Sequence, residues 1–404
     1  MVELPSQTQL LLPLLETIRD AGGAATPGAV YDEVAARLGV SDEVRNAAEI
    51  REDGRVTNLF ERRVRWVRQT CVAKSLLSRE KRGVWELTQK GAAKLGNIVR
   101  GAVLTLFETE RGIFLWANAE DALGVIERES VDLICTSPPY CLIKPKEYGN
   151  LDERSWVEWM LRLCEGWRGL LKNTGSMMIN LGPCWTPGMP AQSLYQERLL
   201  IRLEDELGIH LLQSLYWHSP TKLPTPLGYV GIRRVRVTPS VESVLWLSPD
   251  PNNAKADNRN VLRAYSESGL RSIRGERSRN GDRPSGIKFG ENSFVDRGGS
   301  IPPSLITATP CGVEERRYRK AVAAAGLEPH PAIMPAAVAR FGIQLATDPN
   351  DVVYDPMAGS CTVPVEAMKL GRYAIASDRS RAYLETGEIR CHAEGIDTRR
   401  LIAA

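Results

Sequence analysis

Residues 131–140 have the sequence Val-Asp-Leu-Ile-Cys-Thr-Ser-Pro-Pro-Tyr. The first half is a largely apolar run of strand length, and the second half is a stiff turn with two hydroxyl groups, two prolines and an aromatic ring. Ligands of parallel α/β sheets bind beyond the carboxyl ends of the strands, so a polar turn in this place predicts a functional site. Taken alone, a Pro-Pro-Tyr turn also fits a purely structural role.

The segments on both sides alternate between strand and helix patterns. Strands are expected at 113–116, 131–135, 176–181, 211–217, 241–247, 352–354 and 373–376, and helices at 155–172 and 361–370. This alternation predicts an α/β fold with a doubly wound, Rossmann-like sheet rich in parallel strands. Residues 248–305 interrupt the pattern and are rich in Pro, Asn, Gly, Ser and Arg. A long insertion of this kind is usually functional or disordered.

The candidate catalytic residues are Ser137, Pro138, Pro139 and Tyr140. The prolines lack N–H groups and fix the backbone, which leaves the preceding carbonyls in place as acceptors. The amino nitrogen of a nucleobase is a poor nucleophile because its lone pair is delocalised into the ring. Hydrogen bonds from its N–H groups to Ser137 and to a carbonyl near Pro138 would favour a pyramidal nitrogen, and Tyr140 would stack on a base flipped out of the duplex.

Residues 136–140 resemble the catalytic motif of the amino-group DNA methyltransferases. Ser-Pro-Pro-Tyr is typical of the cytosine-N4 branch, and Asp-Pro-Pro-Tyr is typical of the adenine-N6 enzymes. The resemblance implies methyl transfer from S-adenosylmethionine to a base in duplex DNA, with cytosine N4 favoured over adenine N6. It also implies that Thr136 lies beside the cofactor.

A second motif lies between a predicted strand and a predicted helix: Asp355, Pro356, Met357, Ala358, Gly359, Ser360, Cys361 and Thr362. A turn of small residues lets the backbone approach a cofactor, and the helix N-terminus offers free N–H groups to a carboxylate. The motif resembles the cofactor loop of the same family, Asp-Pro-Phe-x-Gly-Ser-Gly-Thr. Met357 and Cys361 are departures, and Cys361 adds bulk where the backbone normally comes close.

Three further segments complete the predicted cofactor site. Asp378 follows a strand at the spacing of the family's ribose-binding carboxylate. His330-Pro331 resembles the motif that closes over the methionine moiety, and Asn118 takes the place of an Asp thought to face the adenine. The catalytic motif comes first and the cofactor loop last, which is the order of the β group of amino methyltransferases. The resemblance covers about 110–390.

Residues 1–98 are expected to form a separate domain, with the methyltransferase domain at 99–404. Helical patterns at 10–18, 27–38 and 55–73 precede a predicted hairpin of residues 74–77 and 84–87, which is winged-helix order. Residues 10–95 resemble the N-terminal domain of Mrr-type restriction proteins. Nine basic and two acidic side chains in residues 55–82 favour DNA contact over the alternatives, a solvated helix face or a protein-contact module.

Arginines are also concentrated in an insertion at about 220–310, the predicted target-recognition region. Residues 259–283 contain seven arginines and three acids, and arginine suits both phosphates and guanine edges. The candidate DNA-binding residues are Arg62, Arg63, Lys81, Arg82, Arg233, Arg234, Arg236, Arg271 and Arg274.

The composition sets the remaining expectations. The chain has 404 residues and a net charge of +3, and no apolar run reaches the roughly 18 residues of a membrane span. With no signal-peptide pattern, a soluble, cytoplasmic, nucleoid-associated protein is expected. The eight cysteines lack metal-site spacing, so no metal is expected.

The expected partner is double-stranded DNA, and a cognate restriction endonuclease and a homodimer are left open. Two other functions are also left open. One is a DNA-binding regulator whose methyltransferase fold has lapsed, which the departures at Cys361 and Asn118 suggest. The other is methylation of RNA or protein by the same motif.

Overall fold

The computed structural model describes residues 4–50, 56–78, 83–88, 98, 101–141, 152–276 and 295–401. The strands of its large sheet are β5 (Val103–Thr109), β6 (Gly112–Ala117), β7 (Val131–Thr136), β8 (Leu171–Leu181), β9 (His210–His218), β10 (Val241–Ser248), β11 (Leu305–Thr307), β12 (Val352–Asp355), β13 (Tyr373–Asp378) and β14 (Arg399–Arg400). Their order is β11-β9-β10-β8-β7-β12-β13-β6-β5-β14.

Five neighbouring strands, β8, β7, β12, β13 and β6, run parallel. The outer strands β10, β9, β5 and β14 join by antiparallel pairing. The sheet is therefore mixed around a parallel centre, which confirms the expected α/β class. The β5 strand and its hairpin with β6 were not predicted from the sequence.

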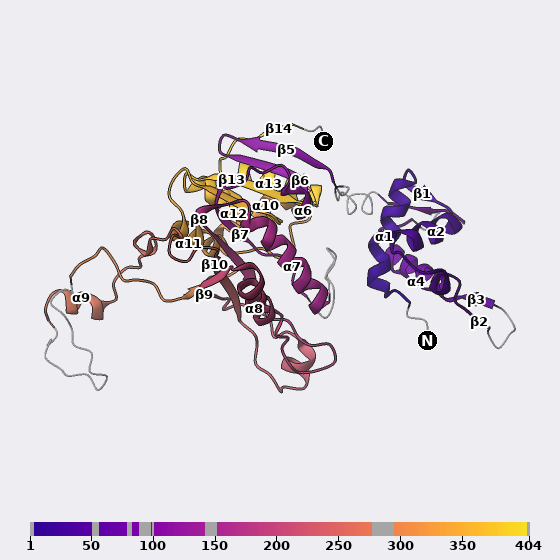
Figure 1. The fold of residues 1–404 in the computed structure, drawn as a ribbon, viewed down its shortest axis with the longest axis horizontal. Coiled ribbons are helices and arrows are strands. Elements are labelled where there is room, and N and C mark those ends of the chain that lie inside the picture. The colour runs from indigo at the N-terminus through magenta and orange to yellow at the C-terminus, as the bar shows by residue number, and fades with distance from the viewer. Residues whose placement is uncertain are drawn as a thin grey trace.

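Helices cover both faces of the sheet (Figure 1). On one face lie α6 (Ala119–Ala122), α7 (Glu153–Arg168) and α8 (Tyr195–Leu207). On the other lie α11 (Ala336–Ala346), α12 (Thr362–Lys369) and α13 (Arg381–Ala393), with α10 (Val313–Ala324) packed on α13. Helices on both faces of a parallel centre confirm the doubly wound arrangement.

The β7 strand is buried along its whole length. Leu133 and Cys135 pack with the α11–α13 side, and Ile134 packs with the α7 side. A strand covered on both faces is apolar at successive positions, which explains the run seen in the sequence. Its one acid, Asp132, accepts hydrogen bonds from Lys172 Nζ (2.7 Å) and the Val352 amide (2.9 Å).

The N-terminal elements have their own hydrophobic cluster. They are α1 (Gln7–Asp20), β1 (Ala24–Ala25), α2 (Pro27–Arg37), α3 (Asp42–Arg45), β2 (Ala48–Ile50), β3 (Val56–Asn58), α4 (Leu59–Ala73) and β4 (Trp85–Glu86). The predicted hairpin is present as an antiparallel bridge between Leu77 and Leu87, and β4 also pairs with β1.

The predicted third helix begins four residues late, at Leu59 rather than 55. Residues 56–58 pair with β2 as a short hairpin, and the Asn58 side chain accepts a hydrogen bond from the Glu61 amide to cap α4. The insertion also has more structure than its composition suggests. Residues 220–310 contain η1 (Gly228–Ile232), η2 (Asn258–Val261) and α9 (Glu267–Ile273), together with β10 and β11, which belong to the large sheet. No helix in the described part of the chain is long and apolar enough to cross a membrane.

Candidate active site

The carboxyl ends of β7 and β12 meet at the centre of the sheet. Thr136 Oγ1, at the end of β7, donates to Asp355 Oδ1, at the end of β12, over 2.8 Å. The two strands are neighbours in space although 219 residues separate the bonded pair. The structure thus brings the predicted catalytic turn and the predicted cofactor loop together at one edge, where ligands of such sheets bind.

The catalytic turn is held from two sides. Trp156 Nε1 on α7 donates to the Pro139 carbonyl over 2.6 Å. The ring of Tyr140 lies so close to Gly182 that a Cβ there would come within 2.5 Å of Tyr140 Cε2. Trp156 thus fixes the Pro139 carbonyl, and Ser137, at the start of the turn, is partly exposed.

A polar network backs the turn. The Ser137 and Tyr140 hydroxyl oxygens are 3.2 Å apart, and the Tyr140 hydroxyl donates to Glu242 Oε2 over 2.8 Å. Asn180 Nδ2 donates to both Tyr140 (3.1 Å) and Glu242 (3.0 Å), and Lys222 Nζ donates to Glu242 Oε1. Glu242 is buried on β10 and Asn180 on β8. The network therefore joins three strand ends behind Ser137.

The predicted cofactor loop folds back onto β13. The Ala358 amide donates to the Ser377 carbonyl (2.9 Å), and the Gly359 amide donates to Asp378 Oδ2 (2.8 Å). Gly359 has φ +49°, and a Cβ at this residue would lie 3.1 Å from His330 Nε2. His330 and Asp378 thus both border the loop, as the sequence predicted for one site. Burial raises the pKa of the Asp378 carboxyl.

Cys361 departs from the usual loop glycine, and its backbone has the conformation that glycine favours, with φ +56°. Its sulfur is buried and directed at α13, where a Cβ on Gly387 would come within 2.3 Å of Cys361 Sγ. The added bulk is accommodated by a glycine in the neighbouring helix.

The loop has the chemistry expected for S-adenosylmethionine. Asp378 is a buried carboxylate at a strand end that suits ribose hydroxyls. Arg390 is 4% exposed and donates to Thr362 Oγ1 over 2.8 Å, while its Nε and Nη2 find no hydrogen-bond partner among the described residues. The guanidinium also lies over the Tyr318 ring at 4.2 Å, so Arg390 is a buried cation that holds the first residue of α12, and the N-terminus of a helix suits a carboxylate. The sulfonium of the bound cofactor would supply the methyl group.

Asn118 lies directly after β6, at the same edge of the sheet. Its Nδ2 donates to Asp121 Oδ2 over 2.9 Å, and that oxygen also accepts the Gly101 amide. The amide replacing the family's Asp is therefore paired with a carboxylate three residues on. A contact between Asn118 and a cofactor adenine stays a prediction.

Burial raises the pKa of Asp355 to about 7, and the hydrogen bonds from Thr136 and the Met357 amide only partly oppose this. The folded protein therefore holds a proton that the unfolded chain releases near pH 4. The contribution of this carboxyl to the free energy of unfolding is fully present below about pH 4. It is lost as pH rises through about 7, by at most about 1.4 kcal/mol per pH unit.

We expect ligand-free protein to unfold at lower urea concentration at pH 8 than at pH 5. In Asp355→Asn, which retains an acceptor for Thr136 and Met357, this difference is expected to shrink. Because Asp378 acts in the same direction, the comparison of wild type with Asp355→Asn isolates Asp355. An unchanged pH dependence in the variant would contradict the raised pKa.

The candidate DNA-binding residues of the insertion are exposed. Arg233, Arg234 and Arg236 follow η1, and Arg233 lies over the ring of Tyr229 at 5.7 Å. Arg271 pairs with Glu267 on α9 at 3.6 Å, a type of surface pair worth little energy. Arg274 lies directly after α9, with Glu276 at 3.9 Å. The segment carrying α9 extends away from the sheet (Figure 1).

The N-terminal candidates fall into three groups. Arg62 is exposed on α4 and pairs with Glu49 at 2.8 Å, next to Trp66, which is 60% exposed. Arg63 is half-buried and donates to the Leu4 and Pro5 carbonyls, so it also anchors the segment before α1. Lys81 and Arg82 lie outside the described residues. DNA contact by any of these residues stays a prediction.

Sequence reasoning assigned no role to Glu242, Asn180 or Lys222. Glu242 and Asn180 lie in segments that match the family, at a strand start and a strand end, but no pattern marks them as facing Tyr140. Their partnership depends on the neighbouring positions of β8 and β10, which pair antiparallel with Ser243 opposite Leu181. Only the register of these strands brings the two side chains together.

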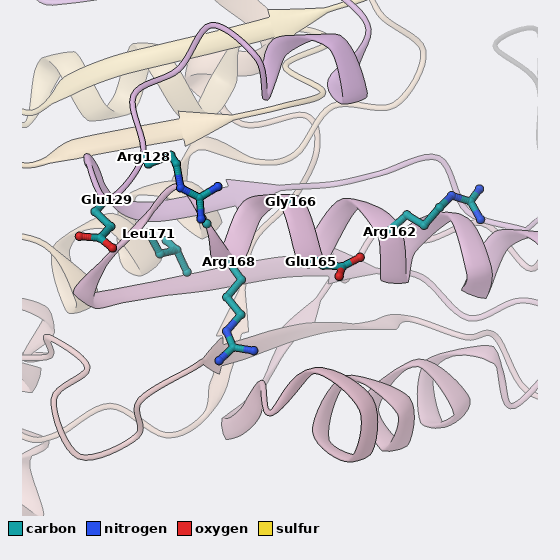
Figure 2. A pocket seen from close by; sticks show the side chains of 8 residues that line it. Arg128, Glu129, Arg162, Glu165, Gly166, Arg168 and Leu171 are labelled. Atoms are coloured by element: carbon teal, nitrogen blue, oxygen red, sulfur yellow. The ribbon is translucent and has the colours of Figure 1, made fainter.

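A surface hollow lies at the other edge of the sheet (Figure 2). It is lined by Arg128, Glu129, Arg162, Glu165, Gly166, Arg168, Gly169 and Leu171. Glu129 precedes β7 and Leu171 opens β8, so the hollow is at the amino ends of these strands. The length of β7, about 17 Å, separates it from Ser137, and it takes no part in the candidate site.

Two segments of the chain match known protein families. Residues 131–388 match the DNA methylase family, and residues 8–97 match the Mrr N-terminal domain. The first match contains the catalytic turn, the cofactor loop and Asp378 in the order described above.

Two curated relatives are type II methyltransferases. The chain is 33% identical over 286 residues to M.PvuII of Proteus hauseri, covering 70% of this chain and 84% of the relative. It is 25% identical over 285 residues to M.HpaI of Haemophilus parainfluenzae, covering 69% of this chain and 73% of the relative. The solved structure titled PvuII DNA methyltransferase (cytosine-N4-specific) matches with a TM-score of 0.58 and 29% identity, over 72% of this chain and 90% of that one.

Proposed function

Because this chain belongs to the DNA methylase family, whose methyl donor is S-adenosylmethionine, we propose that it methylates the exocyclic N4 nitrogen of cytosine in duplex DNA. The observation that carries the proposal is Ser137, half-buried at the carboxyl end of β7 beside the bond between Thr136 and Asp355. A neutral hydroxyl at this position is typical of the cytosine-N4 branch. The similar PvuII DNA methyltransferase is named as cytosine-N4-specific, which supports the same base.

Each residue of the turn would have a separate role in methyl transfer. Ser137 Oγ and the Pro138 carbonyl would accept the two N–H groups of the base, which directs the nitrogen lone pair at the methyl group. Tyr140 would stack on the flipped base. The nitrogen forms a bond to the methyl carbon as the carbon–sulfur bond of the cofactor breaks, and the nitrogen then releases one proton.

The remaining surfaces would bind and select the DNA. We place a domain boundary at 98–99, with the Mrr-like unit adding DNA affinity and the insertion at about 220–310 reading the target site. The exposed arginines after η1 and on α9 suit phosphates and guanine edges. As a restriction-modification methyltransferase of the cytoplasm, the protein would protect sites that a cognate endonuclease cleaves.

Adenine N6 is the alternative target, since its amino group makes the same hydrogen bonds. A lapsed enzyme is less well supported, because the Cys361 sulfur is buried against Gly387 of α13. The test is transfer of labelled methyl groups to duplex DNA, followed by digestion and identification of the labelled nucleoside. We expect N4-methylcytosine. Label in N6-methyladenine would contradict the base assignment, and no transfer to any duplex pool by well-folded protein would contradict the function.

A further inference from the structure

We infer that Glu242 is a positioning residue that fixes the direction of the hydrogen bonds behind Ser137 and so keeps the Ser137 oxygen free to accept. This inference rests on the proposed function and assigns a role to a residue outside the recognised motifs. It rests on the donors and acceptors of the network around Glu242, in which Glu242 and Asn180 are buried.

The carboxylate sets the direction of the first bond. An ionised carboxylate only accepts hydrogen bonds. Tyr140 must therefore donate its single hydroxyl proton to Glu242, over the 2.8 Å that separates the two oxygens. Lys222 and Asn180 also donate to Glu242, so all three neighbours in the network make the hydrogen bonds that a carboxylate accepts.

The first bond then fixes the second. With its proton given to Glu242, the Tyr140 oxygen only accepts, and it already receives Asn180 Nδ2 at 3.1 Å. The Ser137 hydroxyl, 3.2 Å from Tyr140, must then be the donor in that pair. Its lone pairs remain for the amino group of the substrate, as methyl transfer requires.

Replacing Glu242 by Gln reverses this direction. Glutamine has one acceptor oxygen, and the Lys222 ammonium, which carries only donors, competes for it. The amide nitrogen then faces Tyr140 and Asn180, so Tyr140 donates to Ser137 instead. Ser137 would then accept from Tyr140, which leaves one lone pair instead of two for the base, and its own proton would compete with the substrate amino group for the same position.

The experiment measures the single-turnover rate of methyl transfer to duplex DNA for wild type, Glu242→Gln, Tyr140→Phe and the double variant. We expect Glu242→Gln to be slower by about 100-fold. Tyr140→Phe removes the hydroxyl between Glu242 and Ser137, so it is expected to cost only about 10-fold, the effect of losing one hydrogen bond. The double variant is expected to have the rate of Tyr140→Phe. Without the Tyr140 hydroxyl, the residue at 242 has no hydrogen bond through which it can reorient Ser137.

A wild-type rate in Glu242→Gln, or a double variant slower than both single variants, would overturn the inference. The matched control is Glu366→Gln, another buried acid bonded to a lysine (Lys369, 2.9 Å) on α12, which should retain the wild-type rate. Calorimetric affinity for S-adenosylmethionine and melting temperature report folding separately.

If Glu242→Gln fails to fold, the pair Lys222→Met/Glu242→Gln is compared with Lys222→Met. Without the ammonium, the glutamine oxygen can face Tyr140, and the two rates should agree within a few-fold. A further loss of about 100-fold would overturn the role. Wild-type protein that methylates no duplex would instead refute the proposed function, so the two failures are distinguishable.

Discussion

Replacing Ser137 by alanine is expected to lower the single-turnover rate of methyl transfer by about 100-fold or more. The substitution removes the oxygen that accepts from the amino group and keeps the backbone of the turn. It leaves the bond between Thr136 and Asp355 intact, and Asp355 begins the cofactor loop. Affinity for S-adenosylmethionine, measured by calorimetry, should therefore stay within a few-fold of wild type.

The same strand offers a matched control. Ser130 directly precedes β7 and bonds the Glu127 carbonyl (2.7 Å), at the opposite edge of the sheet. Ser130→Ala makes the same chemical change and should leave the rate unaltered. A Ser137→Ala protein with a wild-type rate would show that the hydroxyl is not the acceptor.

The large sheet was predictable because its central strands are buried on both faces. A strand such as β7 is apolar at four of its six positions, and the alternation with helices then implies parallel pairing. The edge strands carry weaker patterns. Residues 103–109 were not predicted as β5: they include strand-forming residues, but the two fully buried ones, Leu106 and Phe107, are consecutive, so the run lacks the alternation of a half-buried strand.

The candidate site was predictable only where a short contiguous motif encodes it. Residues 136–140 and 355–362 each form one turn, so the side chains that act together are contiguous and can be recognised from the sequence. Glu242 is more than 100 residues from Tyr140, and their bond depends on which strands are neighbours and on their register. The role of Gly387 could not be predicted for the same reason, because it depends on the packing of α13 against Cys361, the residue before α12.

Gly387→Ala tests that packing. A Cβ on Gly387 would lie 2.3 Å from Cys361 Sγ and 2.9 Å from Cys361 Cβ. The sulfur is fully buried and cannot swing to solvent, so α13 or the cofactor loop must shift. Overpacking of this kind costs about 1–3 kcal/mol of folding stability. Because the loop is pinned to Asp378 through Gly359, affinity for S-adenosylmethionine should fall by about tenfold or more.

The second substitution Cys361→Gly should reverse both effects. It removes the clashing sulfur and relieves a positive φ that costs a non-glycine residue about 1–2 kcal/mol. Gly28→Ala is the matched control, since it also adds a methyl group within a helix but meets no atom within 4 Å. It should leave stability unchanged or slightly raised. Melting temperature and calorimetry decide the outcome: if Cys361→Gly fails to rescue Gly387→Ala, the loop is not held by this contact, and the bulk at Cys361 must be absorbed on the cofactor side.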